Sequence, residues 1–417
     1  MSPSRVIRSY LVISGIFTLS ASLIWGINTL FLLDAGLTIF QVFVANAVFT
    51  AAMALFEIPT GVVADTYSRR LSLIIGCLGT GVAWMAVGVV SAPWLIIALW
   101  GVWGLAYTFT SGAEEAWIAD EVGADKVGRI FLKGSRVWYV GAVAGLVLQV
   151  AIGIYSLRAG VIVGGAVTVI AGLLCLVAMP ETGFTRKPRE ERGSALSELK
   201  ATAKTGVRYA WAAPVIVLLI GVDFFMGMSS EAFDRLKEAH FLRDVGLPAV
   251  GSLEPVVWFG IFWLVGMVLG FFATGWMLKR FERGGLRVVT TMLFALTALE
   301  MVAMFAFAFA GATGLAIVAL LAVFFARDLA GPLYTIWLND QIRDSTVRAT
   351  VLSISGQANA IGQAGGGPVL GAIGNVWGIR AALATGAAVI APALALYGRA
   401  IAHQGREPEL EELPAEA

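Results

Sequence analysis

Charge is scarce in this chain of 417 residues: Asp, Glu, Lys and Arg make up 14% of it, and 58% of the residues are hydrophobic. Soluble domains carry about 25% charged residues. A soluble protein of this size would need more charged residues to cover its surface than this chain has. The high apolar content also excludes a disordered chain, and two cysteines are too few for a disulfide scaffold. The composition predicts an integral membrane protein whose surface mostly faces the lipid bilayer.

Cysteine and histidine are equally scarce. Cys77 and Cys175 lie within apolar runs, where packing is their expected role, whereas His240 and His403 lie outside these runs. The sequence has no HExxH, CxxC or GxxxxGK[ST] motif. We therefore predict no enzymatic activity, no metal site and no cofactor. The net charge of +1 argues against nucleic acid as a partner.

Long apolar runs dominate what is present. A helix needs about 20 mostly apolar residues to cross a bilayer, and isolated helices satisfy their own backbone hydrogen bonds there. The chain predicts an all-α membrane protein with twelve such spans, numbered 1 to 12 in chain order. They lie at about residues 10–33, 38–63, 71–90, 93–119, 132–154, 159–179, 212–231, 254–278, 287–310, 313–338, 350–374 and 377–400.

The connections between these spans carry most of the Lys and Arg. Most of these basic residues lie in the connections on one side of the membrane, and few lie in those on the other side. With a cytoplasmic N-terminus, the basic residues concentrate on the inside, as the positive-inside rule requires. An even number of spans then places both termini in the cytoplasm. We expect a multi-pass monomer in the cell membrane (the inner or plasma membrane). The outside connection from Glu231 to Glu254 is expected to be a solvated turn.

A weak internal repeat divides the chain into two halves. Gly61 and Arg69 recur as Gly275 and Arg283, Asp120 and Arg129 recur as Asp340 and Arg348, and Gly141 and Gly145 recur as Gly362 and Gly366. We predict pseudo-symmetric six-helix bundles at 1–179 and 212–400, a cytoplasmic loop at 180–211 and a tail at 401–417. Two six-helix repeats with a small-molecule substrate between them are the plan of a secondary transporter.

The connection after span 2 carries a recognisable motif. It contains Gly61, Asp65, Ser68, Arg69 and Arg70 in the pattern Gly-x3-Asp-x2-[Gly/Ser]-Arg-[Arg/Lys]. This pattern resembles the cytoplasmic loop signature of the major facilitator superfamily, and with twelve spans the resemblance covers most of the chain. Ser68 stands where the family most often has glycine.

The signature predicts a cytoplasmic gate. Gly61 is expected to let two helices approach closely, and Asp65 to accept hydrogen bonds from a helix N-terminus. Arg69, followed by Arg70, is placed to bridge Asp65 and Asp120. The resemblance implies that this cluster latches the transporter in its outward-facing state.

Two further motifs resemble drug exporters. The longer form Glu57-x-Pro59-x5-Asp65-x3-Arg69-Arg70 is similar to one subgroup of tetracycline exporters, in which the glutamate matters for efflux. Drug/proton antiporters carry Gly-Pro-x2-Gly-Gly in span 5. Here span 5 has glycine spacing without proline, and the clearer match is in span 11 from Gly362 to Gly371. In both spans the glycine-rich face predicts close packing against another helix.

Charged residues within spans are costly and mark functional sites. The resemblance implies that spans 1, 4, 7 and 10 line the cavity, and these spans contain Asn28, Glu114, Asp223, Arg327 and Asp328. Asp223 and Asp328, followed by Glu57 and Glu114, are the proton-coupling candidates, because burial disfavours the charged carboxylate. Arg327 either receives an anionic substrate group or forms a structural ion pair with Asp223 or a span-4 glutamate. Glu300 in span 9 is expected to be structural.

Aromatic residues accompany these charges. Trp100, Trp103 and Tyr107 follow one another at helical spacing toward Glu114. Such a cavity suits amphipathic compounds, whereas the alternative role of these rings is packing between helices.

The function predicted is proton-coupled efflux of small amphipathic compounds, driven by the proton gradient. The first alternative is an importer or permease for a sugar or another small metabolite. The alternative of a different class is a membrane sensor that does not transport.

Overall fold

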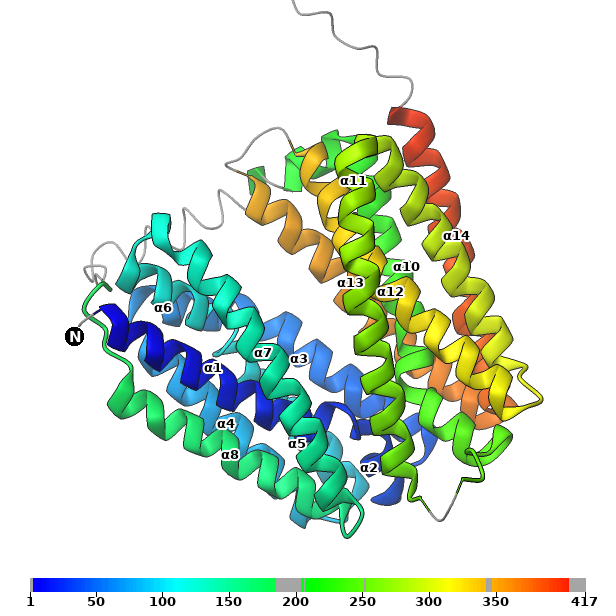
Figure 1. The fold of residues 1–417 in the computed structure, drawn as a ribbon, viewed down its shortest axis with the longest axis horizontal. Coiled ribbons are helices and arrows are strands. Elements are labelled where there is room, and N and C mark those ends of the chain that lie inside the picture. Colours follow the sequence, from blue (N-terminus) through cyan, green and yellow to red (C-terminus); the bar gives the residue numbers. More distant parts are fainter. Residues whose placement is uncertain (1–2, 185–203, 206, 251–252, 343–346, 405–417) are drawn as a thin grey trace, which may run out of the picture. The chain divides into compact units, whose positions relative to one another are not determined.

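The structure is a computed structural model, and it describes residues 3–184, 204–205, 207–250, 253–342 and 347–404. Within these ranges the regular structure is helical, without a strand (Figure 1). This confirms the all-α fold class. Most of the predicted loop at 180–211 and all but the start of the predicted tail at 401–417 lie outside the described residues.

The helices follow one another along the chain with short connections. Their bounds are α1 (Pro3–Trp25), α2 (Asn28–Asp34), α3 (Ile39–Thr66), α4 (Arg69–Val89), α5 (Pro93–Thr108), α6 (Ala113–Val122), α7 (Ala124–Gly153), α8 (Leu157–Ala178), α10 (Pro214–His240), the π-helical turn η1 (Phe241–Val245), α11 (Pro255–Ala308), α12 (Thr313–Gln341), α13 (Arg348–Trp377) and α14 (Ile379–Gln404).

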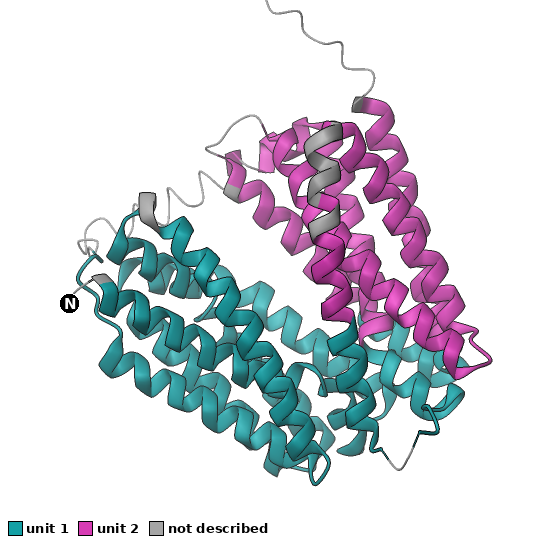
Figure 2. Cartoon of the chain, in the orientation of Figure 1, with its two compact units in different colours: residues 1–197, 235–265, 367–379 teal, residues 198–234, 266–366, 380–417 magenta. Residues whose placement is uncertain are grey.

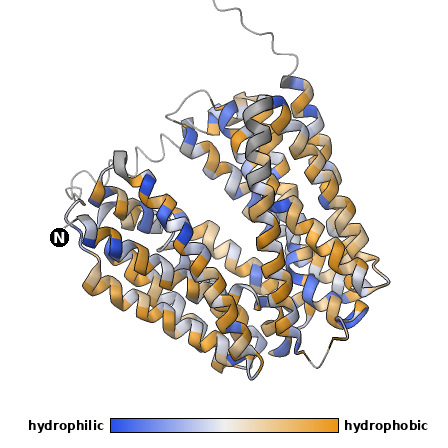
Figure 3. Cartoon of the chain, viewed as in Figure 1, coloured by the Kyte–Doolittle hydropathy of each residue, from blue (hydrophilic) through white to orange (hydrophobic). Residues whose placement is uncertain are grey.

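Eleven helical stretches in the described residues are long and apolar enough to cross a membrane. Hydrophobic residues occupy much of the length of the helices (Figure 3). The predicted span at 350–374 is not among the eleven, although α13 is 30 residues long. Its Gly, Gln, Asn and Ser residues lower its mean hydropathy. The twelfth span and the cytoplasmic placement of the termini remain predictions.

Span 4 is not the continuous helix that we predicted. The first part, α5, ends at Thr108, and α6 begins at Ala113 after a turn. Gly112 in this turn has φ 67°, a left-handed conformation that favours glycine. The Thr108 and Thr110 hydroxyls bond to nearby backbone carbonyls, which competes with regular helix bonding. Glu114 therefore lies in the first turn of a second, short helix.

The chain forms two compact units (Figure 2). Unit 1 consists of residues 1–197, 235–265 and 367–379, and unit 2 of residues 198–234, 266–366 and 380–417. Both units therefore draw on segments that are distant in sequence. The predicted six-plus-six division at 179 and 212 remains a prediction.

Glycine pairs bring helices into close contact within each unit. In unit 1, a Cβ at Gly141 would lie 2.9 Å from the Gly15 carbonyl oxygen, and one at Gly145 would meet the Leu19 carbonyl oxygen, so α7 packs closely on α1. In unit 2, a Cβ at Gly362 would meet the Phe224 carbonyl oxygen, so α13 packs closely on α10. The predicted close packing at both glycine pairs is confirmed.

Gly362→Ala is expected to destabilise the protein, by about 1–3 kcal/mol, because the new methyl group overpacks the contact between α10 and α13. Gly365→Ala on the same helix is the matched control, since nothing lies within 4 Å of its added Cβ. Thermal unfolding of both variants in detergent checks this. A Gly362→Ala protein that melts with the Gly365→Ala protein would contradict the close contact.

The end of α10 corrects one expectation. The segment from Glu231 was predicted to be a solvated turn, but the helix continues to His240, and Glu231, Glu238 and His240 are buried. Pairing makes this burial possible: the His240 Nδ1 atom lies 2.9 Å from an Asp244 carboxylate oxygen, and Lys237 contacts Glu238 at 3.0 Å.

Candidate functional site

A cavity of about 210 Å³ lies within unit 2, and helices α10, α11, α12, α13 and α14 all contribute to it. Most of its lining side chains are polar. They are Asp223, Met226, Ser230, Thr297, Glu300, Arg327, Ala330, Gly331, Tyr334, Asn359 and Tyr397. This cavity brings together two of the predicted residues, Asp223 and Arg327, and adds Glu300, which the sequence had assigned to a structural role.

Asp223 is held in a network of neutral groups. The Ser355 hydroxyl donates to its Oδ2 atom, and the Tyr334 hydroxyl lies 2.8 Å from the Ser355 Oγ atom. The Asn359 side chain donates to the Asp223 carbonyl oxygen at 3.2 Å, and Gln363 donates to Asn359 at 2.7 Å. No Lys, Arg or His pairs with Asp223 among the described residues. Among the polar residues of α13, Ser355 thus bonds to the carboxylate of Asp223, and Asn359, held by Gln363, bonds to its backbone.

Arg327 is committed to two carboxylates. Its Nε atom donates to Glu300 Oε1 at 2.6 Å, and its Nη1 atom donates to Asp234 Oδ1 at 2.8 Å. The guanidinium also stacks over the Phe233 ring at 4.9 Å. Of the alternatives for Arg327, an ion pair is present, but its partners are Asp234 and Glu300 and not the predicted Asp223 or a span-4 glutamate. The reason is that Asp234 and Glu300 lie on neighbouring helices within reach of it.

Asp328 lies elsewhere. Its side chain is exposed and packs where a Cβ on Gly270 of α11 would stand, and it is not among the residues lining the unit 2 cavity. Adjacent residues on a helix point about 100° apart, so Arg327 and Asp328 cannot both face the same cavity squarely. The two leading coupling candidates, Asp223 and Asp328, are therefore in different surroundings.

A second cavity, of about 280 Å³, lies within unit 1. Glu114 and Tyr107 line it, and the Glu114 Oε1 atom is buried without a hydrogen-bond partner in the described residues. Glu57 accepts a hydrogen bond at 2.7 Å from Ser111, which also lines this cavity. The turn between α5 and α6 therefore gathers three of the predicted residues. The full lining is Ile13, Ser14, Phe17, Thr18, Trp25, Leu73, Cys77, Tyr107, Thr110, Ser111, Gly112, Glu114, Glu115 and Trp138.

Trp103 and Asn28 are not among the residues that line this cavity. Trp103 is buried, and its ring contacts Phe49 at 4.3 Å and Trp100 at 5.5 Å between centroids. Asn28, at the start of α2, donates to Asn46 at 3.2 Å. In this structure both residues join neighbouring helices within unit 1.

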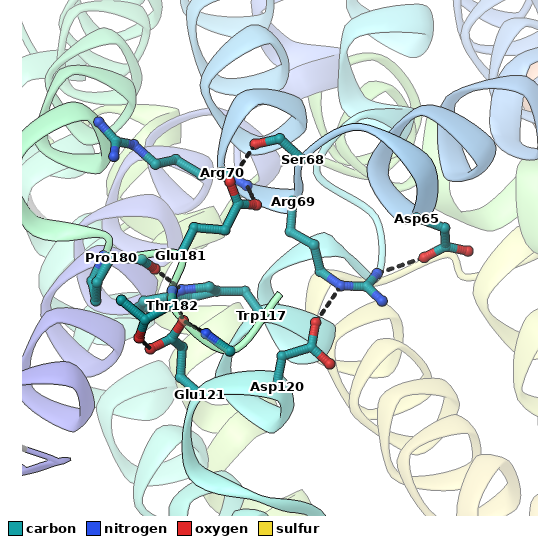
Figure 4. A network of polar contacts seen from close by, with 11 residues as sticks. Asp65, Ser68, Arg69, Arg70, Trp117, Asp120, Glu121, Pro180, Glu181 and Thr182 are labelled. Carbon is teal, nitrogen blue, oxygen red and sulfur yellow. Dashed lines mark hydrogen bonds and ion pairs between the residues drawn. The ribbon is translucent and has the colours of Figure 1, made fainter. Parts of the chain in front are cut away.

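The motif after span 2 forms the contact that the sequence predicted. Arg69 donates from Nη1 to Asp65 at 2.5 Å and from Nε to Asp120 at 2.8 Å (Figure 4). We call these three residues the Arg69 cluster. Arg70 donates instead to the Leu176 carbonyl oxygen at 2.5 Å. The cluster therefore joins α3, α4 and α6.

The structure adds two details to the motif. A Cβ at Gly61 would meet no atom of the described residues of unit 1 within 4 Å, so the predicted close helix contact at this glycine is not made within unit 1. The carboxylate at the N-terminus of α4 is not Asp65 but Glu181, which accepts from the Ser68 hydroxyl at 2.7 Å and from the Arg70 backbone N–H at 3.1 Å.

Sequence reasoning missed the segment that follows α8. Beside Glu181, the backbone N–H groups of Thr182 and Gly183 donate to Glu121 at 2.5 and 2.7 Å, and the Trp117 ring N–H donates to the Pro180 carbonyl oxygen (Figure 4). The segment thus ties α4 to α6 next to the Arg69 cluster. Its only signal in the sequence is a polar run, Pro180 to Gly183, directly after a span.

The helical fold and this motif define a class of membrane protein, and comparisons with known proteins agree. The family model described as Major Facilitator Superfamily matches residues 10–364. The uncharacterized MFS-type transporter YxaM of Bacillus subtilis (strain 168) is 22% identical over 381 residues, which cover 88% of this chain and 89% of YxaM.

Solved structures share the fold at low identity. The nucleoside transporter NupG matches with a TM-score of 0.77 and 13% identity, covering 96% of this chain and 99% of NupG. The peptide transporter POT in complex with sulfate matches with a TM-score of 0.74 and 13% identity, covering 96% and 94%.

The chain belongs to the major facilitator superfamily. It is a multi-pass membrane transporter of that superfamily.

Proposed function

We propose that the protein is a proton-coupled secondary transporter that exports small amphipathic compounds from the cell across the cell membrane by alternating access. Both termini are cytoplasmic in this proposal, and the proton gradient supplies the energy without a cofactor. The Arg69 cluster serves as the gate that holds the cytoplasmic side closed in one state of the cycle.

The observation that carries the proposal is the setting of Asp223. This carboxylate lines the unit 2 cavity, and its side chain contacts a hydroxyl rather than a cation in the described residues. A carboxylate fixed by an arginine stays ionised, whereas one surrounded by neutral groups in an apolar region can take up and release a proton. Asp223 is accordingly the proton carrier.

The amphipathic substrate is supported by the lining of both cavities. Carboxylates and aromatic rings occur together in each, with Glu114 and Trp138 in unit 1 and Asp223 and Tyr334 in unit 2. Such pairs of groups suit a compound with an apolar body and a polar or cationic end. The hydroxyl and amide groups in unit 2 keep a polar metabolite permease as the second candidate.

Ethidium uptake into proteoliposomes tests the proposal. The membrane potential is clamped with valinomycin and equal potassium concentrations, and a pH gradient is imposed in either direction. Export in exchange for protons predicts that an acidic interior drives ethidium uptake, since protons leave as ethidium enters.

The alternatives predict other results. Uptake driven by an acidic exterior would indicate symport, as expected of a proton-coupled importer. A library of drugs, sugars and metabolites that stabilises the protein without any transport would favour a sensor. Either outcome would overturn the proposal of proton-coupled export.

A further inference from the structure

Glu300 of α11 is a buried carboxylate that lines the unit 2 cavity, with only 1% of its surface exposed. Its Oε1 atom accepts from Arg327 at 2.6 Å. Its Oε2 atom is buried and has no hydrogen-bond partner in the described part of the chain. A buried acceptor without a donor costs free energy, and a ligand that brings an N–H group removes this cost.

The charge around Arg327 favours a cationic ligand. One guanidinium faces two carboxylates, Glu300 and Asp234, and the ionised form of Asp223 adds a third acid to the same region. The summed formal charge of Arg327 and these three acids is negative even when Asp223 is protonated. The Nε and Nη1 atoms of Arg327 are already engaged by carboxylates, and Nη2 contacts the Met304 sulfur at 4.0 Å.

Glu300 and Asp223 differ in their partners. Glu300 contacts the Arg327 guanidinium through one oxygen, and its other oxygen has no donor in the described residues. Asp223 contacts the Ser355 hydroxyl and pairs with no cation in the described residues. Glu300 therefore suits substrate binding, and Asp223 suits coupling.

We propose that Glu300 binds an N–H group of a cationic substrate, either a protonated primary or secondary amine or, as in ethidium, an amino group on a cationic ring. The inference rests on the proposed function, because it assigns the substrate of the same cavity. An N–H donor can satisfy the free oxygen of Glu300, whereas a quaternary ammonium cannot. Ser230, Thr297 and Tyr397 supply further polar groups around it. The cavity of about 210 Å³ accommodates a small amine or the amine end of a larger molecule.

Four indole compounds of similar size test this proposal by equilibrium binding to the purified protein in detergent at neutral pH. Tryptamine is a primary ammonium, N,N,N-trimethyltryptammonium is quaternary, tryptophol is neutral and indole-3-propionate is an anion. The wild-type protein is expected to bind tryptamine about tenfold or more tightly than the other three, because only tryptamine forms charge-assisted N–H bonds.

Variants of the two acids that contact Arg327 separate an effect on substrate binding from an effect on the structure. Glu300→Gln is expected to reduce tryptamine binding to the level of tryptophol. Asp234→Asn removes the other carboxylate that contacts Arg327, but Asp234 is not among the cavity-lining residues, so this variant is expected to reduce the tryptamine preference less than Glu300→Gln does. A fluorescence-detected size-exclusion profile confirms that each variant is folded, and Glu300→Asp, which keeps the charge, is expected to retain part of the preference.

The proposal is overturned if wild-type protein binds the four compounds equally, if Glu300→Gln keeps the preference, or if Asp234→Asn loses it to the same extent. The first of these results needs no variant and is independent of folding. Binding requires no pH gradient, so the two proposals fail separately. If the protein keeps its preference for tryptamine but shows no ethidium uptake driven by a pH gradient, only the proposal of proton coupling is contradicted.

Discussion

Asp223→Asn is expected to abolish the ethidium uptake that a pH gradient drives, reducing it to the level of protein-free liposomes. Asparagine is close to aspartate in shape and can still accept the hydrogen bond from Ser355, but it cannot carry a proton. Exchange of ethidium across the membrane without a pH gradient is expected to continue. Counterflow and gradient-driven uptake, measured on the same preparation, check this.

Asp328→Asn is the matched control for this variant. It makes the same chemical change at the other leading coupling candidate, but the Asp328 side chain packs against Gly270 and is not among the cavity-lining residues. It is expected to keep gradient-driven uptake. If Asp328→Asn loses coupling and Asp223→Asn retains it, the assignment of the proton carrier is wrong.

Arg69→Lys is expected to slow the maximal rate of transport by about tenfold while leaving substrate affinity nearly unchanged. Arginine binds Asp65 and Asp120 through two different nitrogen atoms, and the single ammonium of lysine cannot reproduce this geometry. The Asp65 side chain is 61% exposed, so the thermal stability should change little, in keeping with the roughly 0–1 kcal/mol of surface ion pairs. Initial rates at varied ethidium concentration separate rate from affinity.

Arg70→Lys provides the comparison for the Arg69 cluster. The Arg70 side chain donates to one backbone carbonyl, a contact that a lysine can make, so a smaller loss of rate is expected. Asp65→Asn should likewise impair turnover more than binding. Full turnover in both Arg69→Lys and Asp65→Asn would refute the role of this cluster as a gate.

Much of the fold could be predicted from the sequence because the bilayer imposes a simple rule on helix length and polarity. The approximate positions of the apolar helices followed from this rule, and the glycine spacing in spans 5 and 11 predicted close contacts. The break before Glu114 could not be predicted, since it depends on the left-handed Gly112 and on two threonine hydroxyls. Hydropathy also gave no sign that α10 would continue to a buried His240, because the pairing with Asp244 is a matter of structure.

The candidate site was predictable only in part. The spacing within one short motif placed Arg69 between Asp65 and Asp120. In contrast, Arg327 could have met several acids, and only the packing of α10, α11 and α12 shows that its partners are Asp234 and Glu300. Residues that meet through tertiary contacts have no fixed spacing in the chain. Glu181 escaped notice for the same reason, because its partners lie more than one hundred residues earlier.

Proton movement driven by the substrate tests the central claim of coupled exchange most directly. Proteoliposomes containing wild-type protein and a trapped pH-sensitive dye are given external ethidium, with no imposed pH gradient and the membrane potential clamped. Coupled exchange predicts that the lumen becomes alkaline as ethidium enters, because each inward step carries protons out. Ethidium uptake with no change of luminal pH beyond that of protein-free liposomes, or with acidification, would contradict the account.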